Sequence, residues 1–157
     1  MTAQEPDTRP GVYALLLKTA ATTDPVPIGR RDWLTLATPG WAVYIGSALG
    51  QGGVRARLAH HRRPVIRPHW HIDYLRHHSQ LEAVWFSYAP LRRECLWAAV
   101  LAEALGGIAP PFRFGASDCH CPTHLRLFRT SPALATFAAA LRARCPEHGA
   151  VLMWRPE

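Results

Sequence analysis

Hydrophobic runs alternate with polar, Gly- and Pro-bearing segments along the chain, and the period of each run predicts its secondary structure. Runs of β-branched and aromatic residues bounded by turn residues predict strands, whereas apolar positions at a helical spacing predict helices. The expected strands cover residues 11–18, 28–37, 41–47, 81–88 and 149–154. The expected helices cover residues 53–63, 69–77, 90–105 and 131–144, and a structured loop is expected over 107–124. A turn at Pro39-Gly40 predicts a hairpin in which the second expected strand folds back onto the third.

This order of elements predicts an α/β (α+β) fold, with a small central, mainly antiparallel sheet and helices packed on its faces. The chain has 157 residues, of which 48% are hydrophobic, and this size suits one domain with its own core. We therefore expect a single domain over residues 11–157, preceded by a flexible tail over residues 1–10. The tail lacks the features of a secretion signal, and no stretch approaches the roughly 18 apolar residues that span a bilayer. The expectation is a cytoplasmic protein without a membrane partner.

The charge balance favours a nucleic acid as partner. Lys and Arg together number 18 against 11 Asp and Glu, which gives a formal net charge of +7, and Lys18 is the single lysine. The guanidinium group of Arg binds phosphate through a planar, bidentate fork, so an Arg-rich basic domain suits a phosphate backbone. A compositional bias toward Arg and Ala explains the same counts equally well. Charge therefore favours nucleic acid without establishing it.

The stretch GWAVYIGSALGQGGVRARLAHH, residues 40–61, predicts a strand that ends at a glycine turn and continues as a basic helix. On that helix, Arg57 and His61 lie one turn apart on the face that also carries Val54 and Leu58. The two apolar residues hold this face near the sheet, and Arg57 and His61 with it. An ion pair on the helix surface is the alternative role for Arg57. The basic residues expected to contact a phosphate backbone are Arg55, Arg62 and Arg63.

Two tripeptides, GVY at 11–13 and YIG at 44–46, are followed by Arg57 and by His61 four residues later. In this order they resemble the GIY-YIG nuclease superfamily. Three further stretches are similar to the Uri-type endonuclease branch of that superfamily: HWHIDYL, ECLWAAVLAEALGG and FGASDCHCPTHL. The resemblance covers nearly the whole chain from residue 11 to about residue 128. The interval between the two tripeptides is longer than usual for the superfamily, which fits a GIY-YIG-like fold with an inserted strand.

The resemblance implies an endonuclease that hydrolyses phosphodiester bonds in DNA, in repair or processing, with one Mg²⁺ or Mn²⁺. It implies Tyr13 as general base, Tyr44 positioning water or phosphate, and Arg57 stabilising the phosphate. It implies Glu94 as the metal ligand, and His61 either assists a proton transfer or orients a tyrosine. These side chains are expected to converge on one phosphate-sized space. A phenol with a pKa near 10 is a poor base at neutral pH, so Arg57 or the metal must favour the phenolate.

The other expected site residues lie around this group. Those expected to bind substrate are Gly46, Ser47, Arg55, Arg62, Arg63, His71 and His124. Gly46 lets the backbone approach the phosphate because it has no Cβ. Glu103 shares a helix with Glu94 but lies half a turn out of phase, so only one of the two can face the sheet. The chain contains no Asn, so the Asn of many superfamily members would have to be replaced by Ser117 or Asp118.

Four cysteines without a secretion signal predict free thiols or metal ligands rather than disulfides. Cys119, Cys121 and His124 form a C-x-C-x-x-H pattern, and Cys145 with His148 adds C-x-x-H. We expect zinc to be absent, because C-x-C is tight for one tetrahedral ion and the C-x-x-C knuckle is missing.

Alternatives remain at this stage for the function and for the assembly. A non-catalytic nucleic-acid-binding module on the same scaffold is the main alternative to a nuclease, and a zinc-binding adaptor is the third. His71 and Asp73 are expected to support the active site through hydrogen bonds rather than to bind metal. The oligomeric state stays open, with a monomer as one option.

Overall fold

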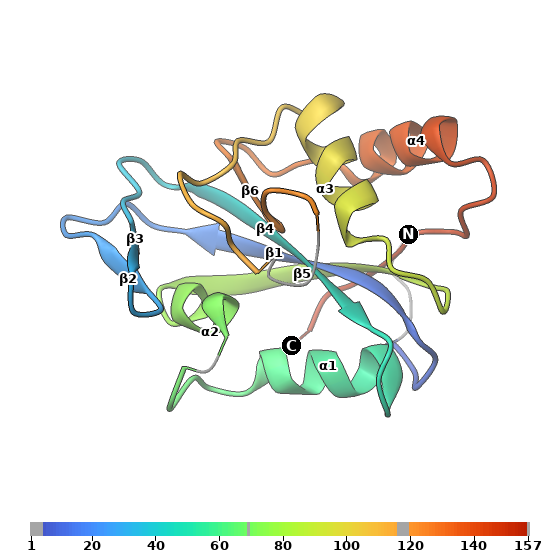
Figure 1. Cartoon of the computed structure of the whole chain (residues 1–157), viewed down its shortest axis with the longest axis horizontal. Helices are drawn as coiled ribbons and strands as arrows, with labels where there is room; N and C mark the ends of the chain where they lie inside the picture. Colours follow the sequence, from blue (N-terminus) through green and yellow to red (C-terminus); the bar gives the residue numbers. More distant parts are fainter. Residues whose placement is uncertain (1–4, 69, 116–119, 157) are drawn as a thin grey trace.

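The computed structural model describes residues 5–68, 70–115 and 120–156 of the chain. Its centre is a five-stranded antiparallel sheet in the order β6-β4-β1-β5-β7 (Figure 1). The strands of this sheet are β1 (Gly11–Thr19), β4 (Gly40–Ala48), β5 (Ser79–Tyr88), β6 (Leu125–Phe128) and β7 (Leu152–Trp154). The helices are α1 (Gly53–Arg62), α2 (His71–Arg76), α3 (Glu94–Glu103) and α4 (Leu134–Arg144). The expected α+β fold with an antiparallel sheet is confirmed.

Strand β1 lies in the middle of the sheet because nearly all of its side chains are apolar and buried. It pairs with β4 on one side and β5 on the other, with Tyr13 opposite Gly46 and Leu15 opposite Tyr44. A strand buried on both faces is expected to be a continuous hydrophobic run, as this one is. The register therefore brings the two tripeptides of the sequence side by side.

Alternate residues of each strand point to opposite faces of the sheet, and each face has its own core. Tyr13, Leu15 and Tyr44 pack on the face covered by α1 and α2. Ala14, Leu16 and their neighbours pack on the face covered by α3 and α4. Figure 1 shows these two helical layers below and above the sheet. The tyrosines and the basic helix α1 consequently belong to one layer.

Two strand predictions were wrong. The region expected as one strand over 28–37 instead forms a separate hairpin of β2 (Val26–Ile28) and β3 (Asp32–Leu34), turned at Gly29 with a φ of 74°. Strand β4 does not pair with it, because β4 is an interior strand that pairs with β1 and β6. Strand β6 was not predicted, because a segment of four residues is too short to show a clear hydrophobic period.

The described part of the expected N-terminal tail is bound to the domain. The carbonyl oxygens of Asp7 and Arg9 accept hydrogen bonds from the first-turn N–H groups of Arg55 and Val54, both at 3.0 Å. The Asp7 N–H donates to the Tyr88 hydroxyl at 2.9 Å. These contacts satisfy N–H groups that the helix itself leaves unpaired. Among the described residues, no helix is long and apolar enough to cross a membrane.

Candidate functional site

A buried hydrogen bond joins β1 to the C-terminal turn of α1. The Tyr13 hydroxyl lies 2.7 Å from Nε2 of His61, and these residues are 2% and 1% exposed. They meet because Val54, Leu58 and His61 form the buried face of α1, as its spacing predicts. Gly46 completes the contact, since a Cβ at that position would overlap the Tyr13 hydroxyl. The glycine is thus required by packing against Tyr13.

Tyr44 lies beside this pair and closer to solvent. Its ring centroid is 6.2 Å from that of His61 and 6.0 Å from that of Phe114. Gly115, with a φ of 68°, sits so near that a Cβ there would be 2.9 Å from the Tyr44 ring. The two motif tyrosines and the helix histidine therefore form one aromatic cluster, closed on one side by the segment around residue 114.

Arg57 lies over the ring of Trp70, with its guanidinium carbon 4.8 Å from the ring centroid. Such cation–π contacts hold an Arg in place without neutralising it. Within the described part of the chain, Arg57 forms no ion pair, so the surface ion pair considered above is not found. Burial raises the pKa of Tyr13, and the Arg57 charge offsets part of that rise. Its position leaves the positive charge available to an anion.

Electrostatics keep the central pair neutral. Burial, followed by the neighbouring Tyr44, raises the pKa of Tyr13 well above 10, and the opposing effect of Arg57 is smaller. Burial also lowers the pKa of His61 from 6.5 to about 3. A neutral phenol and a neutral imidazole therefore share the hydrogen bond at neutral pH. Burial outweighs the effect of Arg57 that was expected to favour the phenolate.

Glu94 is the first residue of α3 and is 6% exposed. Although α3 packs on the other face of the sheet, the Glu94 charge adds to the effect of burial that raises the pKa of Tyr13. Burial lowers the pKa of His124, and the Glu94 charge offsets part of that decrease. Glu103, at the opposite end of the helix, is exposed and pairs with Arg144. The structure thus distinguishes the two candidate carboxylates, because Glu94 is buried at the start of α3 whereas Glu103 is exposed and paired with Arg144.

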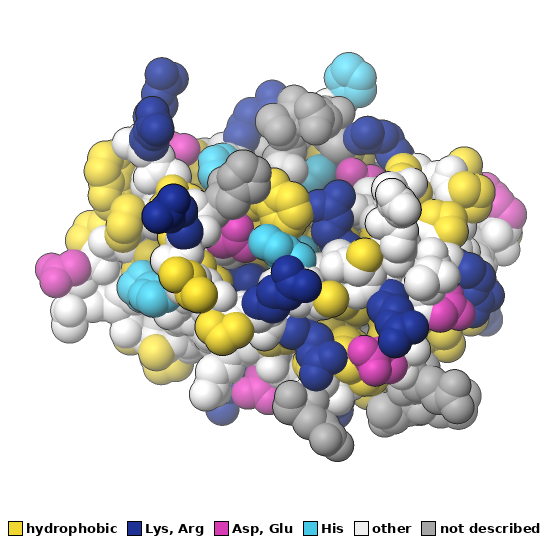
Figure 2. Space-filling view, turned by 90° about the horizontal axis from the view of Figure 1, so that it is seen from below, with side chains coloured by type: hydrophobic (Ala, Val, Ile, Leu, Met, Phe, Trp, Pro, Cys, Tyr) yellow, Lys and Arg dark blue, Asp and Glu magenta, His cyan; other side chains and the backbone are white. Residues whose placement is uncertain are grey.

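The other basic residues expected to bind substrate lie on α1 and at its C-terminal end. Arg55 is exposed, whereas Arg62 and Arg63 line a pocket of about 530 Å³ together with Arg76 and His77. Figure 2 shows Lys and Arg side chains spread over this face of the molecule. A basic surface therefore adjoins the cluster, and His61 contributes to both.

Ser47 departs from the expected site. Strand alternation places it with Val43 and Ile45 on the face that packs against α3, opposite the face of Tyr44 and Gly46. Ser117 and Asp118 lie outside the described residues, as does Cys119.

His71 and Asp73 support the cluster from α2. The His71 Nδ1 accepts a hydrogen bond of 3.3 Å from the Gly115 N–H. The buried Asp73 accepts bonds from the Trp70 N–H at 2.9 Å and from His60 Nε2 at 3.2 Å. Asp73 thereby holds the backbone of Trp70, the residue whose ring contacts Arg57. Neither Trp70 nor His60 was expected at the site, although both lie within stretches quoted for the resemblance.

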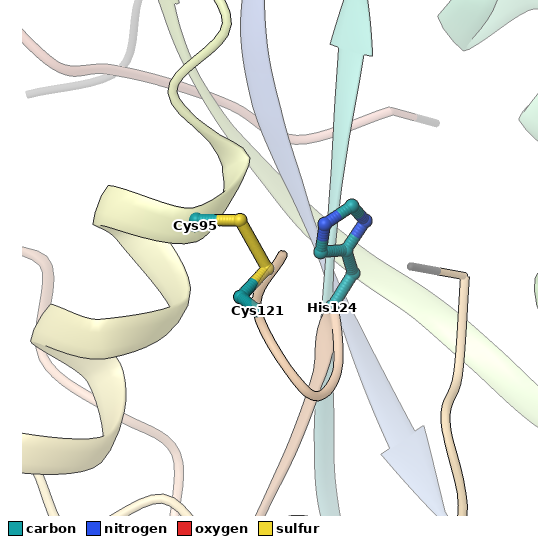
Figure 3. A group of neighbouring side chains, drawn as sticks. All are labelled: Cys95, Cys121 and His124. Carbon is teal, nitrogen blue, oxygen red and sulfur yellow. A yellow bond between two sulfur atoms is a disulfide. The ribbon is translucent and has the colours of Figure 1, made fainter. Parts of the chain in front are cut away.

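His124 lies deeper than a substrate contact requires. It is 4% exposed, and burial lowers its pKa. Its ring lies beside Cys95 and Cys121, which form a disulfide (Figure 3). The expectation of no disulfide was wrong, because the fold brings the start of α3 against the segment before β6. Cys145 is free, as expected.

Comparison with known proteins places the chain in a family. A protein family described as "Domain of unknown function DUF123" matches residues 12–145. No curated protein and no solved structure matches the chain.

Proposed function

The chain belongs to the DUF123 family, and we propose that it is a GIY-YIG nuclease of the Uri type, a metal-dependent endonuclease that cleaves DNA. The observation that carries the proposal is the 2.7 Å hydrogen bond between Tyr13 and His61, made beside Tyr44 and within reach of the Arg57 and Glu94 charges. These five residues come from four separate elements. The contacts among Tyr13, His61 and Tyr44, together with the effect of the Arg57 and Glu94 charges on Tyr13, support a common task in hydrolysis.

The proposed chemistry assigns each side chain a step. His61, neutral and hydrogen-bonded to the Tyr13 hydroxyl, would take the phenol proton at its ring nitrogen as the Tyr13 oxygen takes a proton from an attacking water. Arg57 offsets part of the effect of burial on Tyr13 and would neutralise charge that grows on the phosphoryl oxygens. Tyr44, nearer to solvent, positions the phosphate or the water.

Glu94 is the residue that would hold a divalent cation. Mg²⁺ needs only one or two protein carboxylates and takes its other ligands from water and phosphate. Asp73, the other carboxylate whose charge reaches Tyr13, is bound by Trp70 and His60. Glu94 is buried at the start of α3 and its charge acts on Tyr13, so we assign it to a single-carboxylate site for Mg²⁺ or Mn²⁺. When bound, the cation would stabilise charge on the phosphate in the transition state.

The basic surface next to the tyrosine cluster supports DNA as the substrate. Arg55 is exposed on α1, and Arg62 and Arg63 line the pocket next to His61. Contacts between arginine side chains and phosphates recognise the DNA backbone rather than the bases. We expect binding that weakens steeply with salt and depends little on sequence, as titration of labelled DNA would measure.

A non-catalytic DNA-binding module remains the second candidate. Tyr13 is 2% exposed and burial raises its pKa, and both properties oppose its use as a base. A module that kept the scaffold would bind DNA through the same arginines.

Cleavage assays separate the two candidates. The pure protein is incubated with plasmid, single-stranded and branched DNA in the presence of Mg²⁺, Mn²⁺ or EDTA. Glu94→Gln keeps the size of the side chain but removes its charge, and Tyr13→Phe removes only the hydroxyl. In a nuclease both should lower cleavage by orders of magnitude while DNA binding survives. Glu103→Gln, on the exposed end of the same helix, is the matched control and should cleave like wild type.

Wild-type protein that binds DNA but cleaves none of these substrates with either metal would reject the nuclease and favour the binding module. Equal cleavage by wild type and Glu94→Gln would remove the proposed metal ligand.

A further inference from the structure

Three side chains with metal-binding atoms meet at the start of α3. Cys95 belongs to the first turn of that helix, and Cys121 and His124 belong to the segment that leads into β6. The two sulfur atoms and one ring nitrogen of His124 all lie within 4.8 Å of one another. Figure 3 shows the imidazole ring beside the sulfur pair. These residues are distinct from the carboxylate proposed to hold Mg²⁺.

His124 brings an unsatisfied nitrogen to this cluster. The residue is 4% exposed, and its Nε2 atom is buried without a hydrogen-bond partner among the described residues. A buried polar atom without a partner costs about 1–3 kcal/mol, so such an atom calls for an explanation. A metal ion between the imidazole and the sulfur atoms would provide one.

We propose that the reduced chain binds one Zn²⁺ through the sulfur atoms of Cys95 and Cys121 and a ring nitrogen of His124. Thiolate and imidazole are the ligands that Zn²⁺ prefers, whereas Mg²⁺ and Mn²⁺ prefer oxygen. A solvent molecule completes the tetrahedron. On binding, each thiol loses its proton to solvent and donates the sulfur electron pair to the ion, so no oxidant or reductant takes part in that step.

This ligand set does not require the closely spaced Cys119 and Cys121 to bind the same ion, which was the argument from the sequence against zinc. Cys119 and Cys121 are too close in sequence to bind one ion comfortably, but the fold supplies Cys95, which is 26 residues from Cys121. The Cα atoms of Cys95 and Cys121 are 5.5 Å apart. Zn–S bonds of about 2.3 Å require the sulfur atoms to lie roughly 3.8 Å apart, which side-chain rotation from the disulfide can provide.

The zinc ion and the disulfide are alternative cross-links at the same place. Each joins the first turn of α3 to the segment before β6, next to Glu94. Both hold the backbone of Glu94 in position, and the zinc form does so under reducing conditions. The proposal concerns zinc binding alone and does not depend on nuclease activity.

Metal content of the reduced protein tests the proposal. The full chain is reduced with a phosphine, loaded with Zn²⁺, freed of excess metal and analysed by atomic emission. We expect about one Zn²⁺ per chain in wild type and less than about one fifth in Cys95→Ser, Cys121→Ser and His124→Ala. Cys145→Ser is the matched control, because it removes a free cysteine on another part of the molecule, and it should keep the metal.

Cobalt provides a second measurement that needs no variant. Co²⁺ added to reduced wild type should produce a thiolate-to-cobalt absorption band and the visible bands of a tetrahedral ion, and Zn²⁺ should abolish both. Less than about one fifth of an equivalent of Zn²⁺ in reduced wild type, or cobalt spectra without the thiolate band, would overturn the proposal. Retention of zinc by folded Cys95→Ser or His124→Ala would also overturn it.

Discussion

The buried imidazole of His61 should make the protein lose stability on acidification. The residue is 1% exposed, and burial, followed by the charge of Arg76, lowers its pKa from 6.5 to about 3. Because the folded pKa is the lower one, the unfolded chain binds a proton between these values that the folded chain does not bind. The contribution of neutral His61 is therefore fully present above the unfolded pKa and is lost as the pH falls toward the folded pKa.

The size of this effect follows from the two pKa values. Each pKa unit corresponds to about 1.4 kcal/mol, so the unfolded chain gains roughly 2 kcal/mol from this residue at about pH 5. That is a large part of the roughly 5–15 kcal/mol by which domains are stable. Burial lowers the pKa of His124 and of His148 as well. The free energy of unfolding therefore depends more steeply on pH than His61 alone would cause. A variant at His61 is needed to isolate the contribution of that residue.

His61→Gln isolates the effect, because its amide can still hydrogen-bond to the Tyr13 hydroxyl but does not titrate. Urea unfolding of both proteins from about pH 8 to about pH 5 gives the free energy of unfolding at each pH. We expect wild type to lose roughly 2 kcal/mol more than the variant over that range. A difference between the two proteins that stays constant with pH would refute a neutral, buried His61.

Two further substitutions test the packing around the cluster and in the second core. Gly46→Ala should destabilise the fold by about 1–3 kcal/mol in urea unfolding, because the new Cβ displaces the Tyr13 hydroxyl, and it should perturb DNA cleavage. Gly50→Ala is its control, since a Cβ there meets nothing within 4 Å, and equal effects of the two would contradict the close contact. Phe137→Ala should cost about 3–5 kcal/mol, because this fully buried ring packs against two Trp rings at centroid distances of 5.0 and 5.1 Å. A loss below about 1 kcal/mol for that variant would show that the core of α3 and α4 is loosely packed.

Local patterns were sufficient for most elements of the fold. The hydrophobic run of β1 and the buried face of α1 are encoded in consecutive residues, so both were located within one residue of their ends. The same face predicted that His61 and Arg57 would lie near the sheet. Helix α3 was expected from residue 90 but begins at Glu94, because sequence period identifies helix ends poorly.

Pairings between distant segments were not encoded in this way. The expected hairpin onto β4 does not form. A Pro-Gly turn predicts a change of chain direction but not which strands pair, and β1 offers β4 a longer apolar edge. The support that Asp73 gives to Trp70 and His60 depends on how α2 lies against α1. Such contacts require both helices to be docked before any side chain meets another.

By itself, the sequence determined the class of fold, the order of most elements and the chemical identity of the tyrosine cluster, because periodicity and short motifs act over a few residues. The tertiary structure decided that Glu94 is buried while Glu103 pairs with Arg144 at the surface, and that Cys95 joins Cys121 and His124. It also decided that burial keeps Tyr13 and His61 neutral. The physical reason is the same in each case: desolvation and side-chain contacts depend on distances through space, and strand pairing across the sheet sets those distances independently of separation along the chain.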